Sequence, residues 1–287
     1  MSNNPDKLAI IAGAGQLPQL LADACRAQGR AFSVVKMRGQ SLDWLGAETV
    51  IEAEIERFGA LFEALRTDNC GSVVFAGRID RPNLQLERLD DVTRTLAPRL
   101  IPAIGRGDGT ILRLIASIFE DQGLVIKAAH EILPELLALS GVMGQHAPSA
   151  LDLADIARAE VLTGGLGQLD LGQAAVVAQG QCLGLETLQG TDIMLGFVAK
   201  TAQNLRPNPD GAKGVLFKGP KPSQDLRMDM PAIGVTSVEL AAKAGLAGIA
   251  IKSGAVLMLD RAEIIARADQ LGLFIYGTSD GLGADAQ

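Results

Sequence analysis

The chain has 287 residues, a formal net charge of −7 and only 3% aromatic residues. Because it offers neither a basic stripe nor many aromatic side chains for base stacking, nucleic-acid binding is disfavoured. Its 48% hydrophobic residues predict globular cores, and the length suggests about two domains.

Targeting signals and membrane-spanning segments are not expected. The N-terminal stretch leads straight into a short apolar strand, and no charge-free apolar run reaches the roughly 18 residues of a spanning helix. The three cysteines, Cys25, Cys70 and Cys182, form no CxxC pattern, which fits a reducing compartment and argues against zinc. We therefore expect a cytoplasmic protein.

Strands and helices alternate through the first half of the chain. Strands are predicted at 8–13, 31–37, 72–77 and 124–129, and helices at 17–29, 59–71, 86–100 and 110–123. This alternation predicts a parallel sheet covered on both faces. Residues 1–133 are thus expected to form a Rossmann-like domain.

The composition shifts at 134–150, a stretch with Gly, Pro and Ser that we interpret as a linker. Residues 151–287 are then a second α/β domain. Its helices are predicted at 151–161, 191–205, 237–245 and 261–272, and its strands at 174–179, 182–186, 214–218, 247–253, 255–260 and 273–277.

Two glycine-rich turns precede helices and could hold a phosphorylated ligand. In "IAGAGQLP" (11–18), Gly13, Gly15 and Gln16 could offer backbone N–H groups to phosphate. Pro18 replaces the third glycine of a dinucleotide fingerprint, so nicotinamide binding is not expected. In "IGRGDGTI" (104–111), Gly105 and Asp108 could line a pocket, although helix capping explains Asp108 equally well.

The segment "KGPKPSQDLRMDMPAIG" (218–234) is the strongest candidate for a functional loop. Prolines restrict its conformations, which argues against a merely solvated charged loop. It combines cations with short acids and an amide: Lys218, Lys221, Arg227, Asp225, Asp229 and Gln224. Carboxylates can hold a divalent ion while cations neutralise phosphate oxygens, so the residues predict metal-assisted chemistry on a phosphorylated ligand.

A second acidic group lies near "LETLQGTDIM" (185–194). Thr191 is explained by helix capping alone, but Glu186 at the end of an apolar strand is costly to bury without a cation or metal. Glu186 and Asp192 could therefore flank one edge of a pocket.

Five segments together resemble one enzyme family: "IAGAGQLP", "LDLGQAAVV", "GTDIM", "KPSQDLRMDMPAIG" and "ADQLGLFIYG". They are similar to the metal-dependent, non-calcineurin type of UDP-2,3-diacylglucosamine pyrophosphatase, which serves lipid A biosynthesis. The resemblance implies two α/β domains with the lipid between them. It also implies hydrolysis, dependent on Mg²⁺ or Mn²⁺, to 2,3-diacylglucosamine 1-phosphate (lipid X) and UMP, with water attacking the α-phosphorus.

The residue pattern and the matching motifs, of which "QDLRMD" and "GTD" are the informative ones, together assign roles to individual residues. Asp225 is implied as the essential acid, with Gln224 beside it; Asp225, Glu186, Asp192 and Asp229 are the expected metal ligands. Substrate contacts are expected from Gly13, Gly15, Gln16, Gly105, Asp108, Gln173, Thr191, Lys218, Lys221 and Arg227. The chain departs from the family pattern at Gln189 and Gly109, where acids are usual.

The expected partners follow from this resemblance. They are a lipid-linked nucleotide sugar, a transient contact with the inner-membrane surface, and a second copy in a homodimer. Two other functions stay open: a non-catalytic protein that binds nucleotide sugars, and, less favoured, a nicotinamide-dependent reductase.

Overall fold

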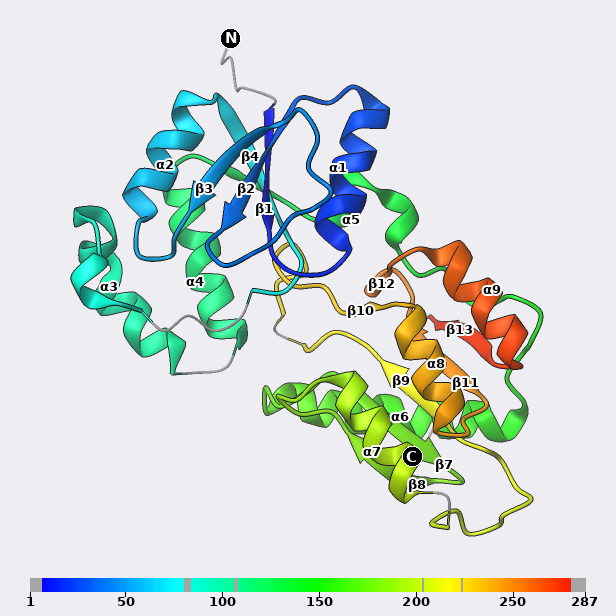
Figure 1. The fold of residues 1–287 in the computed structure, drawn as a ribbon. Helices are drawn as coiled ribbons and strands as arrows, with labels where there is room; N and C mark the ends of the chain where they lie inside the picture. The colour runs from blue at the N-terminus through cyan, green and yellow to red at the C-terminus, as the bar shows by residue number, and fades with distance from the viewer. Residues whose placement is uncertain (1–6, 80–83, 106–107, 203, 223, 280–287) are drawn as a thin grey trace. The chain divides into compact units, whose positions relative to one another are not determined.

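The computed structural model describes residues 7–79, 84–105, 108–202, 204–222 and 224–279, and the chain divides into two compact units (Figure 1). Unit 1 comprises residues 1–134 together with the short segment 225–229, and unit 2 comprises residues 135–224 and 230–287. Five residues from the middle of the predicted functional loop therefore belong to the first unit.

Unit 1 is built on a five-stranded parallel sheet with the strand order β3-β2-β1-β4-β5 (Figure 1). Its strands are β1 (Lys7–Ala12), β2 (Phe32–Met37), β3 (Thr49–Ala53), β4 (Cys70–Ala76) and β5 (Val125–Lys127). Its helices are α1 (Leu17–Gln28), α2 (Phe58–Thr67), α3 (Asp91–Ile104), α4 (Asp108–Asp121) and α5 (Ala129–Ile132), with a 3-10 turn, η1 (Leu86–Arg88). The α/β class and the parallel sheet predicted from the alternation are confirmed.

Two details of unit 1 differ from the sequence prediction. The edge strand β3 was missed, because it has only five residues and buries only Ile51 and Ala53, which leaves a short apolar signal. The helix expected at 86–100 is divided into η1 and α3, since Asp90 accepts a hydrogen bond from the Thr93 backbone N–H and starts a new helix.

Four phenylalanines form the centre of the unit 1 core. Phe119 of α4 meets the rings of Phe58, Phe62 and Phe75 edge-on, with centroids 5.1 to 6.2 Å apart. Edge-to-face contacts of this kind add to the free energy of apolar burial. They fix α4 and α2 against the sheet.

Unit 2 contains a six-stranded mixed sheet with the order β6-β13-β11-β9-β7-β8. Its strands are β6 (Gly141–Met143), β7 (Ala174–Ala178), β8 (Gln181–Leu185), β9 (Val215–Lys218), β11 (Gly248–Lys252) and β13 (Phe274–Thr278). Two further strands, β10 (Ala232–Ile233) and β12 (Leu257–Met258), pair with each other in a separate two-stranded sheet. The strand expected at 255–260 is therefore much shorter and lies outside the main sheet.

Helices cover both faces of the main sheet of unit 2. Residues at alternate positions along the strands pack either with α6 (Ala150–Gln168) or with α7 (Thr191–Thr201), α8 (Val235–Lys243) and α9 (Arg261–Leu271). Among the described residues, no helix is long and apolar enough to span a bilayer.

The stretch interpreted as a linker contributes structure of its own. It contains a 3-10 turn, η2 (Pro134–Leu136), and β6, which pairs antiparallel with β13. Leu136, Ala138 and Met143 are buried. Residues 135–150 are therefore part of unit 2 and not a free connection, a result that the Gly and Pro content concealed.

Candidate active site

The loop after β9 is anchored in unit 1 by one apolar side chain. Met228 is 7% exposed and packs in the same core cluster as Phe119 and the residues of β1 and β4. Backbone N–H groups of Met228 and Asp229 both donate to the Asp225 carbonyl, at 3.0 Å each. The segment 225–229 is thus a tight turn fixed to unit 1 by a buried methionine.

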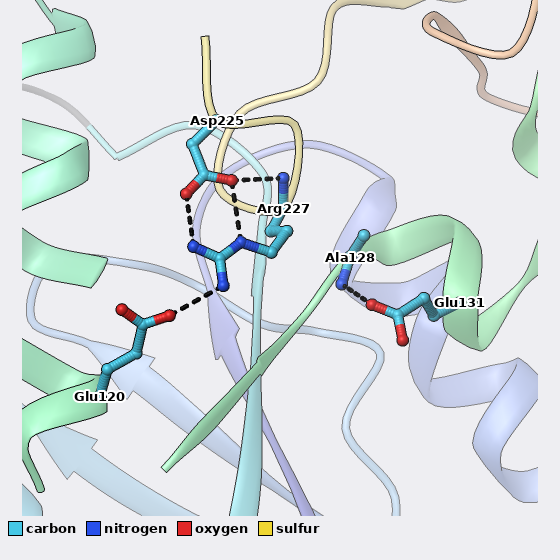
Figure 2. Close-up of polar contacts among 5 residues, drawn as sticks. All are labelled: Glu120, Ala128, Glu131, Asp225 and Arg227. Atoms are coloured by element: carbon cyan, nitrogen blue, oxygen red, sulfur yellow. Dashed lines mark hydrogen bonds and ion pairs between the residues drawn. The ribbon is translucent and has the colours of Figure 1, made fainter. Parts of the chain in front are cut away.

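This turn brings Asp225 and Arg227 to helix α4, as Figure 2 shows. The Arg227 guanidinium donates from Nε to Asp225 Oδ1 (3.0 Å) and from Nη2 to Oδ2 (2.8 Å), while its backbone N–H also donates to Oδ1 (3.0 Å). The third guanidinium nitrogen, Nη1, donates to Oε1 of Glu120 at 2.8 Å. Arg227 therefore links Asp225 to the last turn of α4.

These contacts determine the charge state of Asp225. Hydrogen bonds from the Arg227 side chain hold the pKa of the Asp225 carboxyl below its usual range, and the charge of Arg113 acts in the same direction. The pKa of Arg227 is raised in turn by Asp225 and Glu120. At neutral pH Asp225 is thus a carboxylate, the form that could bind a cation or accept a proton.

Asp225 also keeps capacity to accept another contact. A carboxylate has about four lone-pair positions, and the three hydrogen bonds from Arg227 use two on Oδ1 and one on Oδ2. Its side chain is 18% exposed, against 43% for Arg227. Oδ2 can therefore receive a water molecule or a metal ion without loss of the Arg227 fork.

The glycine turn after β1 is closed by backbone contacts within unit 1. Gly13 N–H donates to the Ala76 carbonyl (2.8 Å), and Ala14 and Arg78 exchange two hydrogen bonds of 2.8 and 3.0 Å. A Cβ atom on Gly13 would lie 2.5 Å from the Arg78 carbonyl oxygen. Gly13 is thus required for close approach of two loops, and its N–H is engaged by Ala76, while a contact of Gly13 with the substrate stays a prediction.

The remaining residues of the two glycine turns lie at helix starts. Gly15 and Gln16 precede α1, and the Gln16 side chain makes no capping hydrogen bond. Gly105 follows α3, and Asp108 is the first residue of α4. Residues 106–107 lie outside the described part of the chain, so a pocket at this second turn stays a prediction.

Unit 2 gathers three other predicted residues. The Lys218 ammonium donates to Thr191 Oγ1 at 2.9 Å, and the Thr191 hydroxyl donates to Glu186 Oε2 at 2.6 Å. All three side chains are more than nine-tenths buried. The cost of burying the Glu186 carboxylate is therefore offset by the Thr191 hydroxyl and, through this hydroxyl, by the Lys218 ammonium.

Other predicted residues of unit 2 have different surroundings. Lys221 forms an ion pair with Asp170 at 2.6 Å, and its backbone N–H donates to Gln224 Oε1 at 2.9 Å. Gln173 is next to Ala174, the register partner of Lys218, so its side chain points to the opposite face of the sheet. Gln173 Oε1 is buried there, and no residue with a described position forms a hydrogen bond to it.

Comparison with known proteins connects both units to one family. Residues 7–136 match the family model "LpxI N-terminal domain", and residues 139–276 match "LpxI C-terminal domain". The UDP-2,3-diacylglucosamine pyrophosphatase LpxI of Caulobacter vibrioides is 41% identical over 271 residues, which cover 94% of this chain and 97% of that protein. The chain belongs to the LpxI family. The resemblance seen in the sequence is therefore confirmed as far as the family is concerned.

In this LpxI-family chain the four predicted metal ligands are divided between the two units. Glu186 and Asp192 belong to unit 2, whereas Asp225 and Asp229 belong to unit 1. Among the residues with described positions, no three His, Cys, Asp or Glu side chains are grouped so as to hold a metal ion. Asp192 is exposed in the first turn of α7, where an acid also suits the helix dipole.

Two charged residues of this LpxI-family site were missed in the sequence. Glu120 and Arg113 lie on α4 and act on Arg227 and Asp225 from more than 100 positions away in the chain. A charged residue on an amphipathic helix normally indicates a solvated face. No local pattern distinguishes these two, so only the fold could identify them.

Proposed function

We propose that this chain hydrolyses the diphosphate of UDP-2,3-diacylglucosamine to 2,3-diacylglucosamine 1-phosphate and UMP, a step of lipid A biosynthesis. The observation that carries this proposal is the 41% identity to the Caulobacter enzyme over nearly the full length of both chains. In unit 2 the buried Lys218 carries a positive charge that suits a phosphate oxygen, and in unit 1 the ionised Asp225 carries a carboxylate that suits a water molecule or a cation.

The proposed reaction is attack of water on the α-phosphorus. The new bond joins the water oxygen to this phosphorus, and the bond from phosphorus to the bridging oxygen breaks. The bridging oxygen leaves with the sugar phosphate, and the water contributes its oxygen to UMP. Asp225 would orient the water or accept its proton, with its carboxylate held by Arg227 and Gln224 nearby in sequence.

We propose Mg²⁺, or Mn²⁺ in its place, as the cofactor. Mg²⁺ usually retains several waters and binds through one or two carboxylates plus substrate phosphates, so a preformed cluster of three acids is not required. The ionised Asp225, whose Oδ2 accepts one hydrogen bond from Arg227, fits this donor set, and Asp229 one turn on could assist. When bound, the ion would neutralise charge on the phosphates.

Membrane contact and self-association complete the proposal. Leu188, Ile193 and Phe197 expose 72%, 63% and 59% of their surface around the start of α7, and such apolar side chains support a transient contact with the inner-membrane surface. We also propose a homodimer, which light scattering after size-exclusion chromatography would test by a mass near twice 30.0 kDa.

The decisive experiment is turnover of UDP-2,3-diacylglucosamine in detergent micelles with Mg²⁺, followed by thin-layer chromatography and detection of UMP. We expect UMP and the sugar 1-phosphate in equal amounts, with no release by the Asp225→Ala variant. A protein that retains the lipid but releases no UMP would instead be a nucleotide-sugar-binding protein. Reduction of the substrate by NADPH would point to the reductase alternative.

A further inference from the structure

The buried chain Lys218–Thr191–Glu186 is an unusual feature of unit 2. The three side chains are only 8%, 7% and 7% exposed, and two of them carry a formal charge. Burial of charged groups is unfavourable unless they are paired and hydrogen-bonded. The hydrogen bonds of 2.9 and 2.6 Å described above supply this compensation.

Strand register explains why Lys218 and Glu186 lie on the same face of the sheet. Lys218 is the register partner of Ala174 on one side, and Glu186 N–H donates to the Ala174 carbonyl on the other (2.9 Å). Residues that lie opposite one another in a ladder point to the same face. The small Ala174 side chain leaves room between Lys218 and Glu186, whose backbones are about 9–10 Å apart across two strand spacings.

The Thr191 side chain lies in this gap and contacts both Lys218 and Glu186. Thr191 is the first residue of α7, and the preceding Gly190 has a φ of 87°. An ammonium only donates and a carboxylate only accepts, so the sense of both hydrogen bonds is fixed. The bridging group must accept from one side and donate to the other. A hydroxyl does this, and the valine of equal shape cannot.

We propose that Thr191 and Glu186 are positioning residues that hold the Lys218 ammonium where it binds a phosphate oxygen of the substrate. Lys218 ends β9, a strand parallel to β11, and ligands of α/β sheets bind at the carboxyl ends of such strands. The adjacent amino terminus of α7 has no side-chain cap and adds positive potential that favours an anion. This inference rests on the proposed hydrolysis and replaces the expected role of Glu186 as a metal ligand.

The first test compares kinetics of four proteins: wild type, Thr191→Val, Thr191→Ser and Thr187→Val. Thr187 is an exposed threonine in the same loop whose hydroxyl donates to Gln189 and not to Glu186, so its variant is the matched control. Loss of a hydrogen bond to a charged group predicts a fall in kcat/KM of about 10- to 100-fold for Thr191→Val. Thr191→Ser and Thr187→Val should stay within about threefold of wild type, since both keep the bridging hydroxyl.

A double variant separates positioning from general damage. If Thr191 acts only through the ammonium, Thr191→Val should have no further effect on kcat/KM in a Lys218→Met background. Equal losses in both backgrounds would overturn the proposal. If Thr191→Val does not fold, Glu186→Gln takes its place, because it removes the carboxylate charge but keeps an acceptor oxygen.

A spectroscopic measurement does not depend on the substrate. In ¹⁵N-labelled protein the hydrogen-bonded Lys218 ammonium should give a slowly exchanging signal, assigned by its absence in Lys218→Met. We expect this signal to persist in Thr191→Ser and to disappear in Thr191→Val. Its persistence in Thr191→Val would overturn the positioning role, even if the wild type proved not to hydrolyse the lipid and the proposed function itself had failed.

Discussion

Arg227 offers the sharpest test of the unit 1 site, and the change is Arg227→Met. The substitution removes the guanidinium that donates twice to Asp225 and once to Glu120, while the length and apolar stem of the side chain are largely retained. Met228 still anchors the turn in the core. Asp225 therefore stays near its position but loses its fixed orientation and its neutralising partner.

The magnitude follows from the contacts. Hydrogen bonds between charged groups contribute about 1.5–3 kcal/mol each in mutational series, but solvent screening reduces this at partly exposed sites. Because Arg227 is 43% exposed, we expect a loss of about 1–2 kcal/mol in the free energy of unfolding. The loss in turnover should be larger, on the order of 10- to 100-fold, because a misplaced catalytic group is costly.

The pH dependence has a definite sign. The pKa of Asp225 is lowered in the folded protein, chiefly by Arg227, so its contribution to stability is present above the unfolded pKa of about 3.9 and is lost as pH falls through the folded pKa. The stability difference between wild type and Arg227→Met should therefore be complete at pH 7 and shrink below about pH 4. Without Arg227 the pKa of Asp225 rises, and the acidic limb of the pH–rate profile moves to higher pH.

The assays are urea unfolding at several pH values and the pH dependence of kcat/KM, with Arg94→Met as control. Arg94 makes an ion pair of similar length with Asp91 but is 61% exposed, so its loss should change neither measurement appreciably. An Arg227→Met protein with an unchanged acidic limb would refute the idea that Arg227 sets the charge state of Asp225.

Four further outcomes are expected. Asp225→Ala should stay folded, with a lowered melting temperature because it loses the same hydrogen bonds to Arg227, and should lose turnover by roughly a thousandfold. A folded variant with near wild-type rate would remove Asp225 from the mechanism. Met228→Ala should lower the free energy of unfolding by about 2–4 kcal/mol in urea titrations; a loss below about 0.5 kcal/mol would show that the turn is not anchored there. Gly13→Ala should lower the melting temperature, because the added Cβ would lie 2.5 Å from the Arg78 carbonyl oxygen. Gly105→Ala is the control, since its Cβ would lie 3.8 Å from the nearest atom, and its melting temperature should match the wild type. Equal melting temperatures of the two variants would contradict this reasoning. Chelation by EDTA should abolish turnover and Mg²⁺ should restore it, and full activity in EDTA would argue against the proposed cofactor.

The sequence by itself was sufficient for the fold class and for the main candidate loop. Apolar periodicity and glycine turns are local signals, and they located most strands and helices of both units. The clustering of Lys218, Lys221, Asp225 and Arg227 within ten residues marked the loop, and its resemblance to known pyrophosphatases singled out Asp225. These conclusions needed only residues that are close together in the chain.

Only the tertiary structure decided which residues act together. Glu120 reaches Arg227 across 107 positions, and Lys218 meets Glu186 only because Thr191 starts a helix beside two paired strands. Strand register likewise placed Gln173 and Lys218 on opposite faces, although both had been assigned to one substrate site. Side-chain partnership depends on register and packing between distant segments, and a linear pattern of residue types carries no such information.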